Sequence, residues 1–302
     1  MKKIIVIAGG TGHLGEKIIH YLLQKNTIVH AIVRFNTSAE KIARLQDLGV
    51  RVIQVDMTNT QEVCNACKGA SCVVSALSGL RDVIMVTQRI LLDAAILAAV
   101  PRFIPSDFCL DFRNLIPGQN RNLDLRREFH EYLDQKHIAA TTIFNGAFMD
   151  LLIGPMPLIL FKIRRVLYWG NVDQLMDFTA MDDVAAFTAN VALENDTPRF
   201  LQIAGDRITA REINADVSEI MPRPYKLFKA GGIGLLNRLI SLTKFISPGK
   251  KDLYPAWQGM QYMRDMMEGR AKLGETDNHR YPSLKFTSIK QFLSSNIKKA
   301  LR

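Results

Sequence analysis

Short apolar runs alternate with amphipathic stretches through the first 150 residues of the chain. Residues 4–8, 27–33, 51–55, 72–75, 102–104 and 140–144 form the apolar runs, which predict strands. Between them apolar residues recur at helical spacing, as at Ile18, Ile19, Leu22 and Leu23. Strands that alternate with helices indicate a parallel sheet covered on both faces. We therefore predict an α/β fold with a Rossmann-type, doubly wound sheet over residues 1–150.

The pattern changes beyond residue 150. Residues 151–163 are apolar, but Gly154, Pro155 and Pro157 exclude a single straight helix there. This segment predicts either a wall or lid over a substrate pocket or a buried connector. A strand is predicted over 200–204, and helices over 209–221, 234–246, 257–273 and 288–301. We therefore expect residues 151–302 to form a smaller, mostly helical substrate-binding region, partly interleaved with the Rossmann sheet.

A glycine-rich turn separates the first predicted strand from the first predicted helix. Gly9, Gly12 and Gly15 give the spacing GxxGxxG, and Gly10 opens the overlapping spacing GxGxxG. Glycine lets the backbone approach a pyrophosphate closely, and the following helix offers free N–H groups and the positive end of its dipole. The turn therefore predicts a dinucleotide site, with these residues in contact with the cofactor: Gly9, Gly10, Thr11, Gly12, His13, Leu14 and Gly15.

The end of the second predicted strand indicates which dinucleotide is bound. Arg34 stands there, 19 residues after Gly15, and no acidic residue occurs before Glu40. A carboxylate at this point binds the ribose 2′-hydroxyl of NAD, whereas an arginine favours the 2′-phosphate of NADP. Lys41 can supply a second cation. We predict NADP(H) rather than NAD(H); the alternative is that Arg34 is a solvated loop residue.

The ends of the third and fourth predicted strands extend the site. Asp56 and Met57 follow the third strand, where we expect them near the adenine. Ser75, Ala76 and Leu77 end the fourth strand, and small residues there would let a cofactor lie across the strand ends.

Composition favours a cytoplasmic protein. The chain has 302 residues, 48% of them hydrophobic, and no apolar run long enough to cross a membrane. We expect no signal peptide, because a strand follows the first two lysines. Cys64 and Cys67 form a CxxC, but they lie on a predicted helix without a partner pair. We therefore expect neither a disulfide framework nor a metal site.

The positive charge is concentrated in the last 80 residues. Residues 223–302 carry 16 basic and 5 acidic side chains, a net charge of +11, whereas the whole chain has +10. Such a surplus can attract nucleic acid, an anionic membrane or an acidic substrate, or can simply keep the surface soluble. No helix-turn-helix, zinc-finger or aromatic RNA-binding signature accompanies it. We expect no membrane or nucleic-acid partner; binding of DNA would instead depend on Lys250, Lys251, Lys298 and Lys299.

Residues 101–108, PRFIPSDF, resemble the RF-(I/L)-PS-(D/E)-F signature of the NmrA-like and isoflavone-reductase-like proteins. These form an atypical branch of the short-chain dehydrogenase/reductase superfamily. The segments that begin at Gln88, at Asn145 (NGAFMD) and at Phe178 (FTAMDDVA) agree with this resemblance. It implies a fold of this type, NADPH as cofactor, and hydride transfer to aromatic or phenylpropanoid-type substrates. Other members of the family bind NAD(P) without turnover and act as redox sensors through a protein partner.

The resemblance also implies roles for particular residues. The nicotinamide end of the cofactor would lie against Ser75, Ala76, Leu77, Ser106, Asp107, Phe108, Asn145, Gly146 and Phe148. The substrate would contact Ser78, Gly79, Phe148 and Met149.

The resemblance implies that Arg126 occupies the position of the family's lysine, or Arg127 if the alignment shifts by one residue. Arg126 is the candidate catalytic residue. No lysine occurs between Lys68 and Lys136. Arginine keeps the positive charge but is a poor proton shuttle, because it stays charged at any ordinary pH. His130, one helical turn further on, can share its face, although a surface position is the more usual one for such a histidine.

Two Tyr-x-x-x-Lys spacings also occur, Tyr21/Lys25 and Tyr132/Lys136. Both are expected at the end of the sheet away from the cofactor, because helices in βαβ units finish there. Two functions remain open: an NADPH-dependent reductase of a small, aromatic or carbonyl/enone-type substrate, or a non-catalytic NADP(H)-binding sensor that acts through a protein partner.

Overall fold

The computed structural model describes residues 2–154 and 156–300, and for residues 297–300 only the backbone. Pro155 and the side chains of Lys298 and Lys299 therefore lie outside the described part of the chain. The described chain divides into two compact units. Of the described residues, the first unit comprises 2–108, 125–143 and 184–201, and the second comprises 109–124, 144–183 without residue 155, and 202–300.

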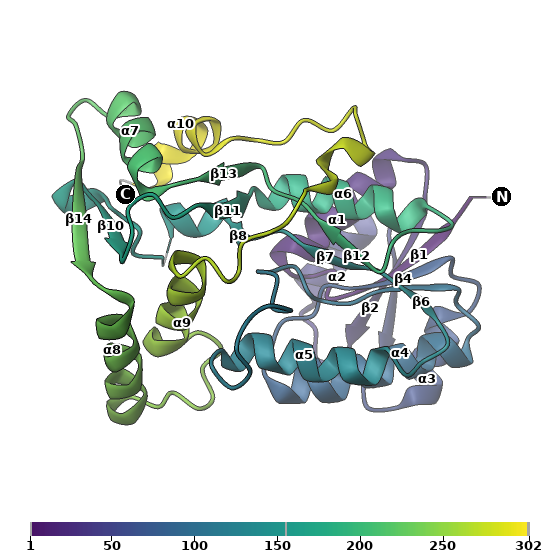
Figure 1. Cartoon of the computed structure of the whole chain (residues 1–302). Coiled ribbons are helices and arrows are strands. Elements are labelled where there is room, and N and C mark those ends of the chain that lie inside the picture. Colours follow the sequence, from purple (N-terminus) through teal and green to yellow (C-terminus); the bar gives the residue numbers. More distant parts are fainter. Residues whose placement is uncertain (1, 155, 301–302) are drawn as a thin grey trace. The chain divides into compact units, whose positions relative to one another are not determined.

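A six-stranded parallel sheet forms the centre of the first unit, in the order β3-β2-β1-β4-β5-β6 (Figure 1). Its strands are β1 (Ile4–Ala8), β2 (Ile28–Arg34), β3 (Arg51–Val55), β4 (Cys72–Ser75), β5 (Arg102–Ile104) and β6 (Ala139–Ala140). The α-helices of this unit are α1 (His13–Gln24), α2 (Ala39–Asp47), α3 (Thr60–Cys67), α4 (Gln88–Leu97), α5 (Arg121–Leu133) and α6 (Met181–Leu193). A π-helical stretch (Asp82–Thr87) leads directly into α4. The first residues of α5 and of α6 belong to the second unit. The strand order reverses between β1 and β4, which is the Rossmann topology. The predicted fold class is therefore confirmed.

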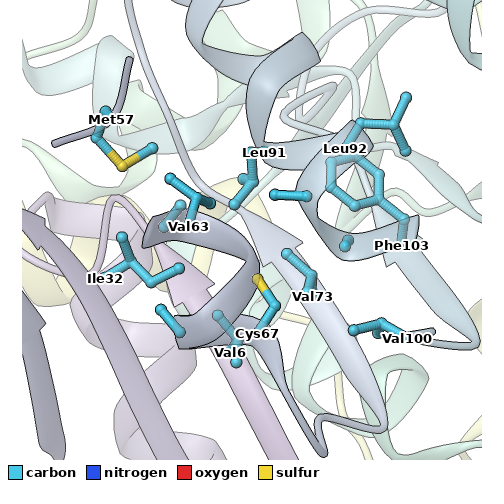
Figure 2. Packing of buried hydrophobic residues seen from close by; sticks show 14 of the residues in the cluster. Val6, Ile32, Met57, Val63, Cys67, Val73, Leu91, Leu92, Val100 and Phe103 are labelled. Atoms are coloured by element: carbon cyan, nitrogen blue, oxygen red, sulfur yellow. The ribbon is translucent and has the colours of Figure 1, made fainter. Parts of the chain in front are cut away.

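Helices cover both faces of this sheet because successive strand residues point to opposite sides. On one face Val6, Val73 and Phe103 lie in one buried cluster with residues of α3 and α4 (Figure 2). Leu125, Phe129 and Leu133 of α5 belong to the same cluster. On the other face Ile7 of β1 lies near Ile19 of α1, with Gly10 between them. Cys67 lies within the first of these clusters (Figure 2), where burial raises the pKa of its thiol to about 12.

The predicted strand 140–144 is wrong as a single element. The chain forms β6, breaks at Thr141, and continues as β7 (Thr142–Phe144), which pairs with β12 (Phe200–Gln202) instead of β5. The break occurs where the backbone changes partners: Thr141 N donates to Phe103 O at 3.0 Å, and Thr142 N donates to Arg199 O at 2.9 Å.

Arg102 fastens the segment that follows α6 to β5. Its buried guanidinium donates to the carbonyl oxygens of Val191 at 2.7 Å and Glu194 at 2.6 Å, both at the C-terminal end of α6. The Val191 carbonyl also accepts from the N–H of Glu194 at 3.2 Å. Carbonyl oxygens at the C-terminal end of a helix carry partial negative charge, so a buried cation is well suited to hold them.

The second unit contains two three-stranded sheets as well as helices, more strand than its sequence pattern predicts. One sheet has the order β13-β11-β8 and the other β14-β10-β9. Its strands are β8 (Ala147–Phe148), β9 (Ile159–Leu160), β10 (Arg165–Trp169), β11 (Met176–Thr179), β13 (Asp206–Ile208) and β14 (Lys226–Gly231). Its α-helices are α7 (Ala210–Ile220), α8 (Ile233–Ile246), α9 (Ala256–Met267) and α10 (Ile289–Ala300), with 3-10 turns at Met149–Ile153, Phe161–Ile163 and Asp277–Arg280.

Two predictions for this unit can be compared directly with the structure. The capping box of α7 is confirmed: Thr209 accepts from the N–H of Glu212, whose carboxylate accepts from the N–H of Thr209. The predicted helix 257–273 is too long, since α9 ends at Met267. Gly269 follows with a φ of +81°, and a residue in this left-handed conformation terminates a helix.

Candidate functional site

The glycine turn after β1 depends on glycine at its first and last positions. Gly9 has a φ of +87°, and a Cβ there would lie 2.5 Å from the carbonyl oxygen of Ala76. A Cβ on Gly15 would lie 2.2 Å from the carbonyl oxygen of Gly9. At Gly10 the nearest atom would be the end of the flexible Ile19 side chain, at 2.8 Å. The GxxGxxG register is therefore the one that the backbone requires.

The N-terminus of α1 is open to solvent. Gly12 is its N-cap residue, so no side chain caps the helix, and both Gly12 and His13 are exposed. Thr11 and Leu14 are half-buried beside them. Uncapped N–H groups and the positive end of the helix dipole can together bind an anion such as a pyrophosphate.

Arg34 and Lys41 bring two cations to the same edge of the sheet. Ala8 pairs with Ile32, so Arg34 lies level with Gly10 at the carboxyl end of β2. Lys41 lies in the first turn of α2, and both side chains are exposed. Neither has a carboxylate within ion-pair distance in the described chain, whereas the nearby Arg44 is paired with Glu16. The two cations are thus available to a phosphate.

Asp56 and Met57 follow β3 at this edge but differ in exposure. Asp56 is exposed, and the hydroxyl and N–H of Thr58 donate to it and hold the pKa of its carboxyl below the ordinary value. Met57 is buried in the core cluster shown in Figure 2. Their predicted place near an adenine stays a prediction.

Gln88 ties the ends of β4 and β5 together. Its Oε1 accepts from the hydroxyl of Ser75 at 2.6 Å and from the N–H of Ser106 at 2.9 Å. The hydroxyl of Ser106 donates to the carbonyl oxygen of Leu77. These bonds fix the two loops that follow the strands. Ser78, the residue after Leu77, is exposed. Gly79 follows at a crowded position, because a Cβ there would lie 2.3 Å from the Val83 side chain.

A buried polar cluster lies directly after Ser106. The carboxylate of Asp107 is 2.5 Å from Nε2 of His130 and accepts from the hydroxyl of Thr142 at 3.1 Å. Burial raises the pKa of the Asp107 carboxyl, but the positive charges of His130 and Arg126 and the hydrogen bonds from His130 and Thr142 outweigh it, so that this pKa lies below its ordinary value. Phe108, the next residue, is buried as well.

Arg126 reaches the same segment from α5. Its Nε donates to the carbonyl oxygen of Ser106 at 3.1 Å, and its side chain is half-buried. The structure therefore brings Arg126, Ser106 and Asp107 together, as predicted from the sequence. The expected surface position of His130 is wrong: this histidine is buried, and its Nε2 lies 2.5 Å from the Asp107 carboxylate and 3.2 Å from the Thr142 hydroxyl.

Tyr132 and Lys136 are engaged elsewhere. The hydroxyl of Tyr132 donates to Asp93 at 2.7 Å, and Lys136 lies 3.2 Å from the same carboxylate. Both positions lie at or beyond the C-terminal end of α5. Their partners agree with the prediction that this Tyr-x-x-x-Lys pair has no part in the site.

The remaining predicted site residues belong to the second unit. Asn145 is buried, and its carbonyl oxygen accepts from the Thr179 hydroxyl at 2.7 Å. Gly146 has a φ of +64°, and a Cβ there would lie 2.2 Å from the carbonyl oxygen of Asp177. Phe148 is half-buried and Met149 fully buried. Their predicted contacts with nicotinamide or substrate stay predictions.

The fold and the glycine turn together define a Rossmann-type protein with a dinucleotide fingerprint. The sequence model of the NmrA-like family matches residues 1–222. The chain belongs to the NmrA-like family.

Several characterised proteins are similar to this chain. Pinoresinol reductase 1 of Arabidopsis thaliana is 25% identical over 202 residues, which cover 62% of this chain and 64% of that protein. The isoflavone reductase homolog IRL of Zea mays is 34% identical over 116 residues, 36% of this chain and 37% of that protein. The match with the first relative thus spans less than two thirds of that protein's length.

Solved structures share the fold over nearly the whole chain. AtPrR2 with NADP+ and (+)-pinoresinol superposes with a TM-score of 0.82 at 19% identity, covering 98% of this chain and 99% of that one. An isoflavone reductase superposes with a TM-score of 0.81 at 19% identity and the same coverage.

Proposed function

We propose that the protein is an NADP(H)-dependent reductase of a small aromatic or carbonyl/enone-type substrate. The observation that carries this proposal is the pair of cations, Arg34 and Lys41, without carboxylate partners at the strand edge that holds the uncapped N-terminus of α1. The relatives named pinoresinol reductase, and the similar fold solved with NADP+ and (+)-pinoresinol, support it.

The residues present fit this cofactor. The N–H groups of the Gly12–His13 turn would bind the pyrophosphate, and the guanidinium of Arg34 would bind the 2′-phosphate through paired N–H donors. Ser75, Ala76, Leu77, Ser106, Asp107 and Phe108 would flank the nicotinamide end, as would Asn145, Gly146 and Phe148. When bound, NADPH would supply the hydride.

Arg126 would act on the substrate through its charge. A guanidinium can polarise a carbonyl or bind a carboxylate, but it cannot give up a proton at ordinary pH. Its hydrogen bond to the Ser106 carbonyl fixes the charge next to the end of β5. The substrate would contact Ser78, Gly79, Phe148 and Met149. A panel of quinones, enones and aromatic aldehydes would determine the chemical class of the substrate.

The test is a titration of the protein with NADPH and NADH, followed by quinones, enones and aromatic aldehydes as substrates. Saturable NADPH binding with substrate-dependent loss of nicotinamide absorbance is the expected result. The Arg126→Ala variant should then lose most of the turnover while NADPH still binds. NADPH binding without turnover of any substrate, with activity gained in Arg126→Lys, would support the sensor function instead. A protein that binds neither cofactor would refute the whole proposal.

A further inference from the structure

Helix α8 exposes apolar side chains along one face to solvent. Leu235, Leu242 and Ile246 are spaced by seven and four residues, which places them on one face of the helix. Their exposed fractions are 47%, 53% and 70%, and that of Phe245 beside them is 87%. Exposed apolar residues scattered singly need no explanation, but a stripe along one helix marks an interaction surface.

This stripe is not the face that holds α8 to its own unit. Leu236 and Ile240 are the buried residues of the helix, and α8 packs against α9 (Figure 1). Lys244 points the same way, since its Nζ lies 5.1 Å from the Trp257 ring of α9. The helix therefore has two apolar faces, one used within the unit and one left open.

The charge around the stripe has one sign. Residues 220–251 contain seven basic side chains and no acidic one. Arg238 lies on the exposed face, four residues before Leu242, while Lys250 and Lys251 follow the helix, and all three are exposed. Within the described chain no carboxylate lies within ion-pair distance of these three cations. The basic surplus of the C-terminal region is thus concentrated around the apolar stripe.

We propose that the open face of α8 binds the surface of an anionic lipid bilayer, with Leu235, Leu242, Phe245 and Ile246 inserted among the lipids and Arg238, Lys250 and Lys251 at the headgroups. An amphipathic helix with cations beside an apolar face lies in the plane of such an interface. No described helix has the length and hydropathy to span a bilayer. This proposal departs from the expectation from sequence that no membrane is a partner.

Other partners match the surface less well. Nucleic acid would use the cations but would gain nothing from inserting Phe245 and Ile246. A second copy of the chain would bring the same cations face to face, and like charges repel. An anionic bilayer uses both the apolar and the cationic residues.

The experiment is co-sedimentation of the full chain with vesicles of phosphatidylcholine and phosphatidylserine, compared with vesicles of phosphatidylcholine alone. Binding to the anionic vesicles only, weakened by salt, is expected. The double variant Phe245→Ser, Ile246→Ser should bind about tenfold more weakly, because it removes the most exposed part of the stripe. Each of Lys250→Gln and Lys251→Gln should weaken binding about fivefold.

Matched controls test the same changes elsewhere. The control variants are Leu97→Ser and Lys68→Gln. Leu97 is 65% exposed on α4, and Lys68 is exposed after α3. Both variants should bind the anionic vesicles like the native chain. The proposal is overturned if the native chain does not sediment with the anionic vesicles at low salt, or if Phe245→Ser, Ile246→Ser binds as well as Leu97→Ser. It is also overturned if the double variant instead abolishes a dimer seen by sedimentation velocity or binding to duplex DNA.

Discussion

Gly15→Ala tests whether close backbone approach shapes the cofactor turn. The new Cβ would lie 2.2 Å from the carbonyl oxygen of Gly9, about 1.2 Å short of the 3.4 Å at which ordinary contact begins. The new Cβ would also lie 2.9 Å from the carbonyl carbon of Gly9 and 3.0 Å from Cα of Gly10. All three are backbone atoms that cannot rotate away, so α1 must move relative to β1.

The expected loss of stability follows from this overlap. Overpacking costs about 1–3 kcal/mol, and a clash with backbone belongs at the upper end, near 3 kcal/mol. The better helix propensity of alanine offsets up to about 1 kcal/mol, which leaves about 2 kcal/mol. This corresponds to a fall in Tm of about 4–8 °C. Displacing the α1 N–H groups by about 1 Å should also weaken NADPH binding at least tenfold.

Gly259→Ala is the matched control. Gly259 lies in α9, and a Cβ there would meet no atom within 4 Å. The same substitution should therefore raise stability, by about 0.5–1 kcal/mol. Thermal unfolding and NADPH titration of both variants measure the two effects. If Gly15→Ala melts at the temperature of Gly259→Ala and binds NADPH like the native protein, the argument from close approach is wrong.

Three further predictions concern charged groups of the first unit. Arg34→Ala should weaken NADPH binding about 30-fold and NADH binding by no more than about twofold. The control Arg44→Ala removes a cation that is already paired with Glu16 and should change the binding of neither cofactor. Equal losses for both cofactors in Arg34→Ala would contradict the predicted role of Arg34. Asp107→Asn should destabilise the protein by about 3 kcal/mol at neutral pH, because it leaves buried His130 without its carboxylate. Because the pKa of Asp107 is lower in the folded protein, the native protein has its full stability advantage over Asp107→Asn above the unfolded pKa of about 3.9. The advantage is lost as the pH falls through the lower folded pKa, so plots of Tm against pH for the two proteins should converge only in strong acid. A constant difference in Tm down to that range would refute the charge argument. Arg102→Met should cost about 3 kcal/mol in urea unfolding, because it removes the side-chain donor to the Glu194 carbonyl and leaves the Val191 carbonyl with only the N–H of Glu194. An unchanged midpoint would show that water replaces the guanidinium.

The sequence predicted the sheet well because its signals are local. Continuous apolar runs marked β1, β3, β4 and β5 to the residue, and glycine spacing marked the turn that holds α1. The split of the sixth strand at Thr141 was not predictable in this way, since β7 leaves the sheet to pair with a strand some sixty residues later. Only tertiary partners distinguish Thr142 from a continuation of β6.

In the candidate site too, residues with a local sequence signal were found and residues defined only by tertiary partners were not. Arg34 was found from its distance to the glycine turn, and Arg126 from the position of the lysine in the family that the sequence resembles. His130 and Thr142 were not assigned a role, because a single histidine on a polar helix and a threonine in an apolar run carry no signal of the buried carboxylate between them. The family signature around Asp107 was the one clue, since a carboxylate directly after a short buried strand requires a partner.

Arg126 and His130 acquire a common role from their spacing on α5. They lie one helical turn apart, and both hold the short segment after β5: Arg126 donates to the Ser106 carbonyl, and His130 contacts the Asp107 carboxylate. One helix thus fixes two consecutive residues of the loop that would face the nicotinamide. A lysine at position 126 would keep the charge but lose the planar Nε–H that reaches Ser106. Arg126 therefore adds its own contact to those by which Gln88 holds this loop, and the substitution Arg126→Lys separates that contact from the charge itself.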